Sequence, residues 1–133
     1  MLFQRATTYG ILALIHMAEQ DADAVHQSHI IARETGVPVT YLRRLLGRLE
    51  RARVLSSRRG YGGGYKLARP PREISLLQIV EAMEGQIDPV WVLPDDLVSG
   101  RSATARGLQR WRQRTASQVR AMLEETTLGD ITR

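Results

Sequence analysis

Apolar residues recur at a spacing of three or four along most of the chain, which is the pattern of amphipathic and buried helices. Segments 54–59 and 65–68 instead indicate two strands joined by a turn. The pattern therefore predicts a mostly α fold with a small β-hairpin. The predicted helices cover about residues 8–19, 29–35, 40–53, 76–84 and 104–125.

Capping residues mark most of the predicted helix ends. A side-chain oxygen before a helix can accept from its unpaired backbone N–H groups, and glycine after a helix easily adopts the left-handed conformation that ends it. The predicted N-caps are Thr7 or Thr8, Ser28, and Ser75 with Gln78 as a capping box, and the predicted closing glycines are Gly36 and Gly85.

The second and third predicted helices, with the glycine-containing turn between them, have the order of a helix-turn-helix motif. At about 100° per residue, the third helix separates into a leucine face and an arginine face. A solvated charged face is the simple interpretation, but Glu50 is the only acidic residue on this helix. The arginines therefore repel one another, which favours binding of an anion. The arginine face contains Thr40, Arg43, Arg44, Gly47, Arg48 and Arg51.

The predicted hairpin has the tip Gly60-Tyr61-Gly62-Gly63-Gly64, where glycines allow positive φ angles and close backbone approach. A glycine-rich loop can also hold a nucleotide phosphate, but such loops open a helix, and no GK[ST] sequence or helix follows here. A basic hairpin directly after a basic helix indicates a wing. We expect Arg58 and Arg59 to reach phosphates or a narrow minor groove, with the third helix in the major groove.

The C-terminal part consists of a loop without periodicity over residues 86–103 and a helix with a narrow apolar stripe. Such a helix needs a partner surface to stay ordered. The alternatives are packing on its own domain and pairing with a second copy, and we favour the second. The stripe comprises Leu108, Trp111, Thr115, Val119, Met122 and Leu123.

The chain of 133 residues has room for one domain and an extra helix, and its formal net charge is +5. Residues 40–72 hold ten basic residues and one acidic residue, a net charge of +9, so the rest of the chain carries 5 − 9 = −4. A basic block in an otherwise acidic chain is suited to a polyanion. No apolar run approaches the roughly 20 residues of a membrane helix. We therefore expect a cytoplasmic protein that does not contact the membrane.

Several motifs together resemble the IscR and NsrR family of bacterial regulators, the Rrf-two superfamily. They are Gly36-Val37 with Tyr41-Leu42, Leu45 and Leu49, the wing sequence from Ser57 to Pro70, Ile74-Ser75-Leu76 with Ile79-Val80 and Glu84-Gly85, Thr7-Thr8-Tyr9-Gly10 with Ala13-Leu14, and Thr127-Leu128-Gly129-Asp130-Ile131. The resemblance spans nearly the whole chain. It implies a homodimeric winged helix-turn-helix repressor or activator, a long C-terminal helix that crosses its partner, and a binding site of two related half-sites.

The resemblance divides the chain into a winged helix-turn-helix domain (1–85), a sensor-type loop (86–103), and a dimerisation helix with the C-terminal segment (104–133). It places Thr40, Tyr41, Arg43 and Arg44 where the family contacts bases and phosphates, and it matches Arg59 to the wing arginine of the minor groove. Many members carry polar or acidic residues in place of Arg43 and Arg44, so the operator sequence does not transfer. The full set of predicted DNA-binding residues is Thr40, Tyr41, Arg43, Arg44, Arg48, Arg58, Arg59, Gly60, Tyr61 and Lys66.

The loop departs from the family because many members bind an iron–sulfur cluster through three cysteines there, and this chain has no cysteine. We therefore predict no cofactor. His26 and His29 lack a credible third metal ligand, so surface or capping roles are favoured and no metal site is predicted. Trp91 and Trp111, with apolar loop neighbours, favour core or interface packing, with an effector pocket as the alternative.

We thus predict a sequence-specific transcription regulator that binds double-stranded DNA as a homodimer on a palindromic operator, with repression favoured. A small-molecule or protein effector is the expected signal. The alternative is a protein-interaction module, or a partner-dependent regulator, that uses the cysteine-free loop as a docking surface. No catalytic constellation stands out, so no enzymatic activity is predicted.

Overall fold

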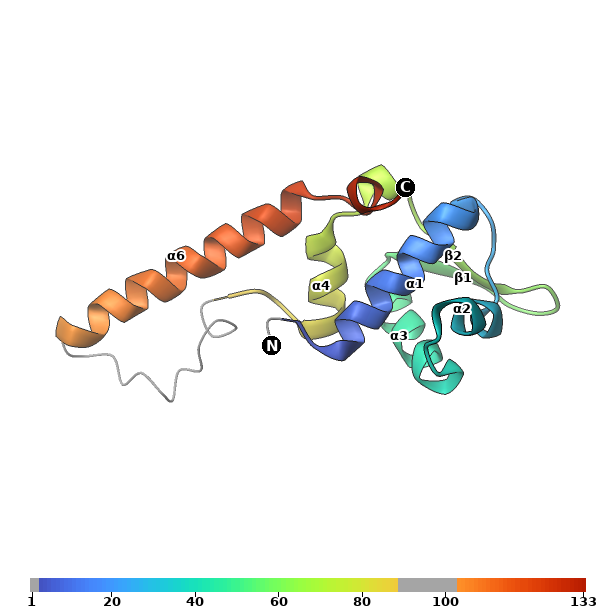
Figure 1. The fold of residues 1–133 in the computed structure, drawn as a ribbon, viewed down its shortest axis with the longest axis horizontal. Helices are drawn as coiled ribbons and strands as arrows, with labels where there is room; N and C mark the ends of the chain where they lie inside the picture. The colour runs from blue at the N-terminus through green and yellow to red at the C-terminus, as the bar shows by residue number, and fades with distance from the viewer. Residues whose placement is uncertain (1–2, 89–102) are drawn as a thin grey trace.

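The computed structural model describes residues 3–88 and 103–133, which form a mostly helical chain with one small antiparallel hairpin (Figure 1). This confirms the predicted fold class. The elements are α1 (Arg5–Asp21), α2 (Ser28–Thr35), α3 (Val39–Arg51), β1 (Leu55–Arg58), β2 (Gly64–Leu67), the 3₁₀ turn η1 (Pro71–Glu73), α4 (Leu76–Glu84), α6 (Ala103–Glu125) and the 3₁₀ turn η3 (Leu128–Ile131).

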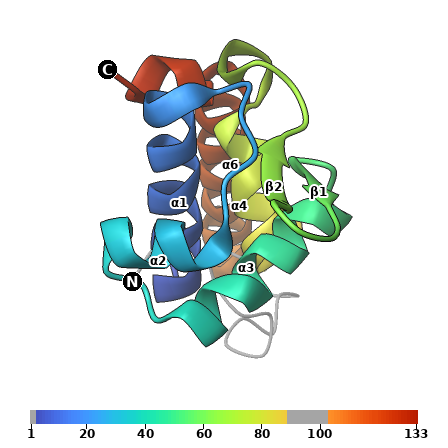
Figure 2. The same ribbon diagram turned by 90° about the vertical axis from the view of Figure 1, so that its right-hand side faces the viewer.

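The core lies between α1, α2, α3 and α4, which together with the hairpin form the head of the molecule. In Figure 2, α2 and α3 lie in front of α1 and α4, and the hairpin lies beside them. The leucine face of α3 points into this core, as predicted. Its four leucines, Leu42, Leu45, Leu46 and Leu49, are all buried.

The hairpin pairs Leu55 with Leu67 at its base and Arg58 with Gly64 near its tip. Leu55 and Leu67 are both buried, so the base of the wing belongs to the core, whereas its outer residues are exposed. The tip of the wing, with Gly60 and Tyr61, is exposed to solvent.

Two of the predicted N-caps are wrong. Helix α1 begins at Arg5, and Thr7 lies inside the helix, where its hydroxyl donates to Glu84. Helix α2 begins at Ser28 itself, and Gln27 occupies the cap position without a side-chain bond. In both cases the helix begins at or before the proposed cap residue, so that residue lies in the first turn.

The other predicted ends are confirmed. Gly36 closes α2 with a φ of 77°, and Ser75 and Gln78 form both bonds of a capping box at α4, which Gly85 closes. Helix α3 ends at Arg51, earlier than predicted, and Arg53 adopts a φ of 62° in the turn into the wing.

Helix α6 packs against α4 by one of its faces. Leu123 and the partly buried Val119 belong to an apolar cluster with Leu77 and Val80 of α4, and Arg120 forms an ion pair with Glu81. Figure 1 shows that the first half of α6 extends away from the head. No helix within residues 3–88 or 103–133 is long and apolar enough to cross a membrane.

The chain after α6 returns to the head and is fixed there. The backbone N–H of Leu76 donates to the carbonyl of Thr126, and that of Leu128 donates to the carbonyl of Ile74, each at 2.8 Å. Leu128 is fully buried. The C-terminal end of α6 is therefore attached to the segment that connects the wing to α4.

Candidate nucleic-acid interface

The N-terminal part of α3 presents Thr40, Arg43 and Arg44 to solvent, opposite the buried leucines. The Nε of Arg43 donates to Oγ of Ser28 at 3.2 Å, which connects the start of α3 to the start of α2. Arg44 forms no hydrogen bond or ion pair with the residues that the structure describes. These three side chains form an accessible basic surface.

Two predicted residues of α3 lie differently. Tyr41 is half-buried, and its ring contacts Tyr9 of α1 edge to face with centroids 5.9 Å apart. Arg48 is exposed but extends toward α4, where its Nη1 lies 3.4 Å from the carbonyl oxygen of Met83. Both side chains have contacts inside the head, a role that the helical pattern alone did not indicate.

The predicted wing residues Arg58, Arg59, Gly60, Tyr61 and Lys66 are all exposed. The two arginines form no hydrogen bond or ion pair within the described part of the chain, so their guanidinium groups face solvent. Tyr61 is fully exposed at the tip. The wing thus offers two cations and an aromatic ring to an outside partner.

The glycines of the tip have separate roles. Gly60 and Gly62 have φ values of 92° and 74°, which side-chain-bearing residues rarely adopt. The backbone N–H of Gly63 donates to the carbonyl of Gly60 at 3.0 Å, and a Cβ at Gly63 would collide with the backbone of Arg58. The tip is therefore a closed turn that depends on glycine.

The wing is joined to the start of α2. His26 and Tyr65 exchange two backbone hydrogen bonds of 2.7 and 2.8 Å, so the residues before α2 extend the hairpin by one bridge. A hollow of about 460 Å³ lies between the two segments. It is lined by Gln27, Ser28, His29 and Gly60 to Gly64.

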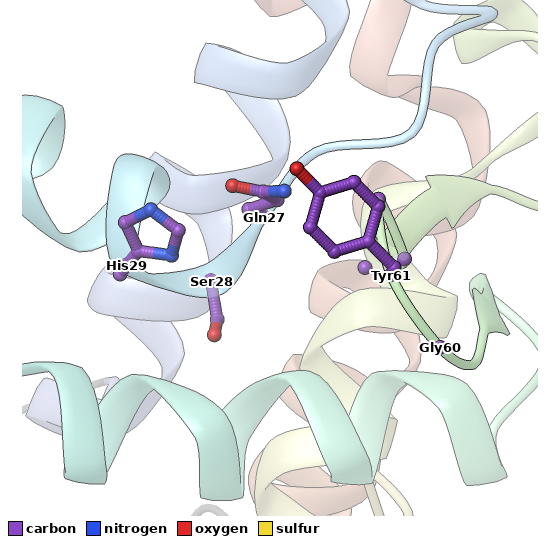
Figure 3. Close-up of a pocket in the computed structure, with 8 residues that line it drawn as sticks. Gln27, Ser28, His29, Gly60 and Tyr61 are labelled. Carbon is purple, nitrogen blue, oxygen red and sulfur yellow. The ribbon is translucent and has the colours of Figure 1, made fainter.

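Figure 3 shows this hollow, with the ring of Tyr61 extending from the wing toward Gln27. Gln27, Ser28 and His29 are not among the residues predicted from the sequence to lie at the candidate interface. The available signal was their position at the start of a helix, where backbone N–H groups favour anions. Their approach to the wing depends on long-range pairing.

His26 lies close to His16 and not to His29, its nearer neighbour in the sequence. The rings of His16 and His26 lie 6.3 Å apart, and Nε2 of His26 is 2.8 Å from the carbonyl oxygen of Asp21, whereas His29 lines the hollow beside the wing. Within residues 3–88 and 103–133, no group of three or more His, Cys, Asp or Glu side chains is placed to hold a metal ion.

The chain is similar in sequence to one known family of proteins. The Rrf2 family, described as an iron-dependent transcriptional regulator, matches residues 3–133. The chain belongs to the Rrf2 family. This confirms the resemblance to the Rrf-two superfamily, and the exposed helix-and-wing surface is that of a DNA-binding transcription regulator.

Individual Rrf2 proteins support the assignment along the whole chain. The HTH-type transcriptional regulator CymR of Bacillus subtilis is 31% identical over 123 residues, covering 92% of this chain and 83% of that protein. IscR of Cereibacter sphaeroides is 30% identical over 127 residues, covering 92% and 81%. A solved structure of B. subtilis CymR, titled as the global cysteine regulator of that organism, has 29% identity and a TM-score of 0.78, covering 97% of this chain and 94% of that one.

The Rrf2 family is described as iron-dependent, but this chain lacks the side chains that usually ligate iron in an iron–sulfur cluster. Iron–sulfur clusters need thiolate ligands, and the sequence has no cysteine. The described histidines and carboxylates also form no three-ligand group. The loop residues 89–102, which include Trp91 of the predicted apolar cluster, lie outside the described residues. The absence of a cofactor stays a prediction.

Proposed function

We propose that this Rrf2 protein is a cytoplasmic, sequence-specific transcriptional repressor that binds a palindromic operator as a homodimer and has no enzymatic activity. The observation that carries the proposal is the unpaired, exposed state of Arg44, Arg58 and Arg59. Unpaired arginines on one head repel each other, and phosphates relieve that repulsion. Repression follows when the operator overlaps a promoter and the bound dimer excludes polymerase.

In this proposal the start of α3 enters the major groove and the wing lies along the backbone or the minor groove. Arg44 is free to donate two of its guanidinium N–H groups to O6 and N7 of a guanine. Arg59 is the proposed minor-groove cation, favoured where A·T-rich DNA narrows that groove. Lys66, on the exposed side of β2, contributes a phosphate contact.

Tyr41 and Arg48 are expected to contribute less to DNA binding than Arg44 does. The ring of Tyr41 is held by Tyr9, so only its hydroxyl edge is proposed to reach DNA. Arg48 must leave the carbonyl of Met83 to bind a phosphate. We therefore expect substitution of Arg44 to weaken binding more than substitution of Arg48.

The test is a gel shift with DNA from upstream of the protein's own gene, with scrambled DNA of equal composition as competitor. Selective binding is expected, together with an affinity that falls steeply as salt rises. Arg44→Ala should weaken specific binding by about tenfold to a hundredfold, as for loss of one bidentate base contact. Arg59→Ala should weaken binding most on operators with A·T-rich flanks.

Arg110→Ala is the matched control, because Arg110 is an exposed arginine of α6 outside the helix-turn-helix and the wing. It removes the same charge and should leave specific affinity within about twofold. Equal binding to operator and scrambled DNA, or equal losses from Arg44→Ala and Arg110→Ala, would reject the proposal. The alternative of a protein-interaction module would then be tested by co-purification after nuclease treatment.

A further inference from the structure

Helix α6 carries a basic block of its own. Residues 103–123 hold five arginines and no acidic residue. Because residues 40–72 carry +9, the residues outside both blocks sum to 5 − 9 − 5 = −9. A second basic block in an otherwise acidic chain is suited to an anionic partner. DNA binding by α3 and the wing does not account for it.

Three of these arginines form a row along the outer side of α6. Arg106, Arg110 and Arg114 are exposed, and none of them forms a hydrogen bond or ion pair with the described residues. At about 100° per residue, the row is centred about 130° from the buried Ala116 and Leu123, and about 130° from the exposed part of the apolar stripe. The arginine row therefore faces neither the head nor the same direction as the stripe.

The arginine row lowers the stability of the helix on its own. Side chains four residues apart are neighbours on a helix surface, and like charges at that spacing repel each other. Arg106 is also the fourth residue of α6, near the positive end of the helix dipole, and the first turn holds no acidic residue. A helix face that meets only solvent typically alternates charges of opposite sign. The arginine row instead indicates a face that meets negative charge.

A hollow of about 370 Å³ lies beside the arginine row. Ser117, which is exposed, lines the hollow and follows Arg114 by three residues, so the two side chains are neighbours on the helix surface. Ile87 and Ala116, each 4% exposed, are the apolar part of the lining. Apolar lining next to a row of cations is an arrangement that can hold one apolar side chain with acidic residues beside it.

The charges around the hollow favour an apolar occupant over an anion. Asp88 and Arg120 both line the hollow, and the guanidinium group of Arg120 is already in an ion pair with Glu81. The hollow therefore has no surplus of positive charge, whereas the arginine row beside it does.

From the arginine row and the hollow together, we propose that the outer side of α6 is the docking surface for an acidic segment of another protein. Carboxylates of the segment pair with the three arginines, and one large apolar side chain enters the hollow against Ile87 and Ala116. From Arg106 to Arg114 is eight residues, or about 12 Å along the helix, which suits a short helix with acidic residues at the same four-residue spacing. Charge pairing of this kind selects the partner more than it adds affinity.

Two observations favour a polypeptide over DNA on this surface. Figure 1 shows the first half of α6 at one end of the molecule and the wing at the other end. Glu124 and Glu125 are exposed, and at about 100° per residue they lie on the same side of α6 as the arginine row. A duplex along α6 would approach these carboxylates, whereas a short acidic segment ends before them.

Peptide display on the full chain, without DNA, tests the inference. Random peptides selected on the immobilised protein should become enriched in acidic residues that accompany one large apolar residue. A synthetic peptide of the enriched sequence should bind about tenfold more weakly to the triple variant Arg106→Gln, Arg110→Gln and Arg114→Gln, as for three exposed ion pairs lost together. Fluorescence anisotropy of the labelled peptide measures the affinity.

The triple variant Arg44→Gln, Arg58→Gln and Arg59→Gln is the matched control. It removes the same charge from the proposed DNA-binding surface and should leave peptide affinity within about twofold. A general attraction of the peptide to a basic protein would weaken equally in both triple variants.

Ser117→Phe and Gln118→Phe test the hollow without a change of charge. Both residues are exposed, but only Ser117 lines the hollow. A phenylalanine at position 117 should occupy the hollow and weaken peptide binding about tenfold, as for loss of an anchoring side chain. The same residue at position 118 should leave the affinity within about twofold. Equal effects would overturn the role of the hollow.

The remaining outcomes separate the acidic segment from other partners. Selected peptides without acidic residues, or equal losses from the two triple variants, would overturn the inference. Weaker operator binding after substitution of the arginine row would assign the row to DNA, and conversion of a dimer to monomers in light scattering would assign it to a subunit interface. Either result would also overturn the inference. Circular dichroism checks that each variant is folded, and the gel shift measures the proposed DNA binding independently of the peptide.

Discussion

His26 and Tyr65 lie in separate parts of the chain and exchange two backbone hydrogen bonds, of 2.7 and 2.8 Å. His26 lies two residues before α2, and Tyr65 lies in the returning strand of the wing. The bridge therefore fixes the wing relative to the helix-turn-helix. Arg59 and Arg44 are on the two parts that it joins, so their spacing depends on it.

Gly64→Ala should break this bridge. An added Cβ would collide with the carbonyl oxygen of His26, one of the two acceptors of the bridge. We expect unfolding free energy to fall by about 1–3 kcal/mol, the usual range for overpacking of a tight contact. Specific DNA affinity should fall at least tenfold, because the wing loses its position. Urea unfolding and the gel shift measure the two effects.

Gly62→Ala is the control for this substitution. Gly62 also has a positive φ, 74°, but an added Cβ would meet nothing within 4 Å. Only backbone strain of about 1 kcal/mol is expected, with a smaller loss of DNA affinity. If the two variants were equally impaired for DNA binding, the bridge would have no special role in positioning the wing.

The recognition helix was predictable because its two faces differ so strongly. Four leucines on one side and arginines on the other leave a single way to bury α3. The orientation of Arg48 toward the carbonyl of Met83 was not predictable, since it depends on where α4 packs. Periodicity thus gave the exposed face but not the contacts of each side chain on it.

The stripe of α6 shows a second limit of periodicity. Val119 and Leu123 pack on the head, whereas Leu108, Trp111 and Met122 are exposed, although all five belong to one apolar pattern. From the sequence alone, the alternatives for this helix are packing on its own domain and pairing with a second copy. The helix has an apolar face for each alternative, because its apolar residues extend over more of its surface than the head covers.

The bridge from His26 to the wing had no signal in the sequence. It joins residues 39 positions apart. Tyr65 lies in a predicted strand, but nothing in the sequence around His26 indicates a strand that would pair with it. The same holds for Ser75 and Thr127, which pair across the C-terminal segment. Local propensity cannot indicate isolated bridges of this kind, because tertiary packing alone brings the two backbones together.

Thr7→Val tests the contact between α1 and α4. Thr7 is fully buried, and its hydroxyl donates to a carboxylate oxygen of Glu84 at 2.5 Å. Valine keeps the shape but removes the donor from a charged acceptor. Because Glu84 is partly exposed and water replaces some of the loss, we expect a destabilisation of about 1–2 kcal/mol in urea unfolding.

Thr8→Val is the matched control for the α1 contact. Thr8 is the next residue of the same helix, is exposed, and donates no side-chain hydrogen bond to the described residues. It undergoes the same change in helix propensity and should shift stability by less than about 0.5 kcal/mol. Equal effects of the two substitutions would show that the hydroxyl of Thr7 is not a stabilising donor.

Two carboxylates near the C-terminus accept hydrogen bonds that depend on their negative charge. The backbone N–H and the hydroxyl of Thr127 donate to the Asp130 carboxylate at 2.8 and 2.9 Å, and these bonds hold the pKa of Asp130 below its ordinary value of 3.8. The pKa of Glu19 is likewise lowered, chiefly by the hydrogen bond from the Arg133 side chain. The bonds of Asp130 close the turn η3, and those of Glu19 attach the last residue, Arg133, to α1.

The sign of the effect follows from the direction of these shifts. A carboxyl group with a lowered pKa in the folded state stabilises the fold above its unfolded pKa, and that stabilisation is lost as pH falls through the folded pKa. Asp130→Asn should therefore be less stable than the unmodified protein near neutral pH. The difference should shrink as pH falls through the lowered folded pKa of Asp130, because the native carboxyl group then also becomes uncharged. Urea unfolding across this range measures the difference.

Asp23→Asn serves as the control for loss of a carboxylate. Asp23 is exposed, and its side chain accepts no hydrogen bond from the described residues. Its substitution should change stability little, because its side chain accepts no hydrogen bond that the amide would lose. If the difference in stability between Asp130→Asn and the unmodified protein persisted unchanged into acid, the asparagine would be destabilising because its amide does not fit the site. The capping box at η3 would then not depend on the negative charge of Asp130.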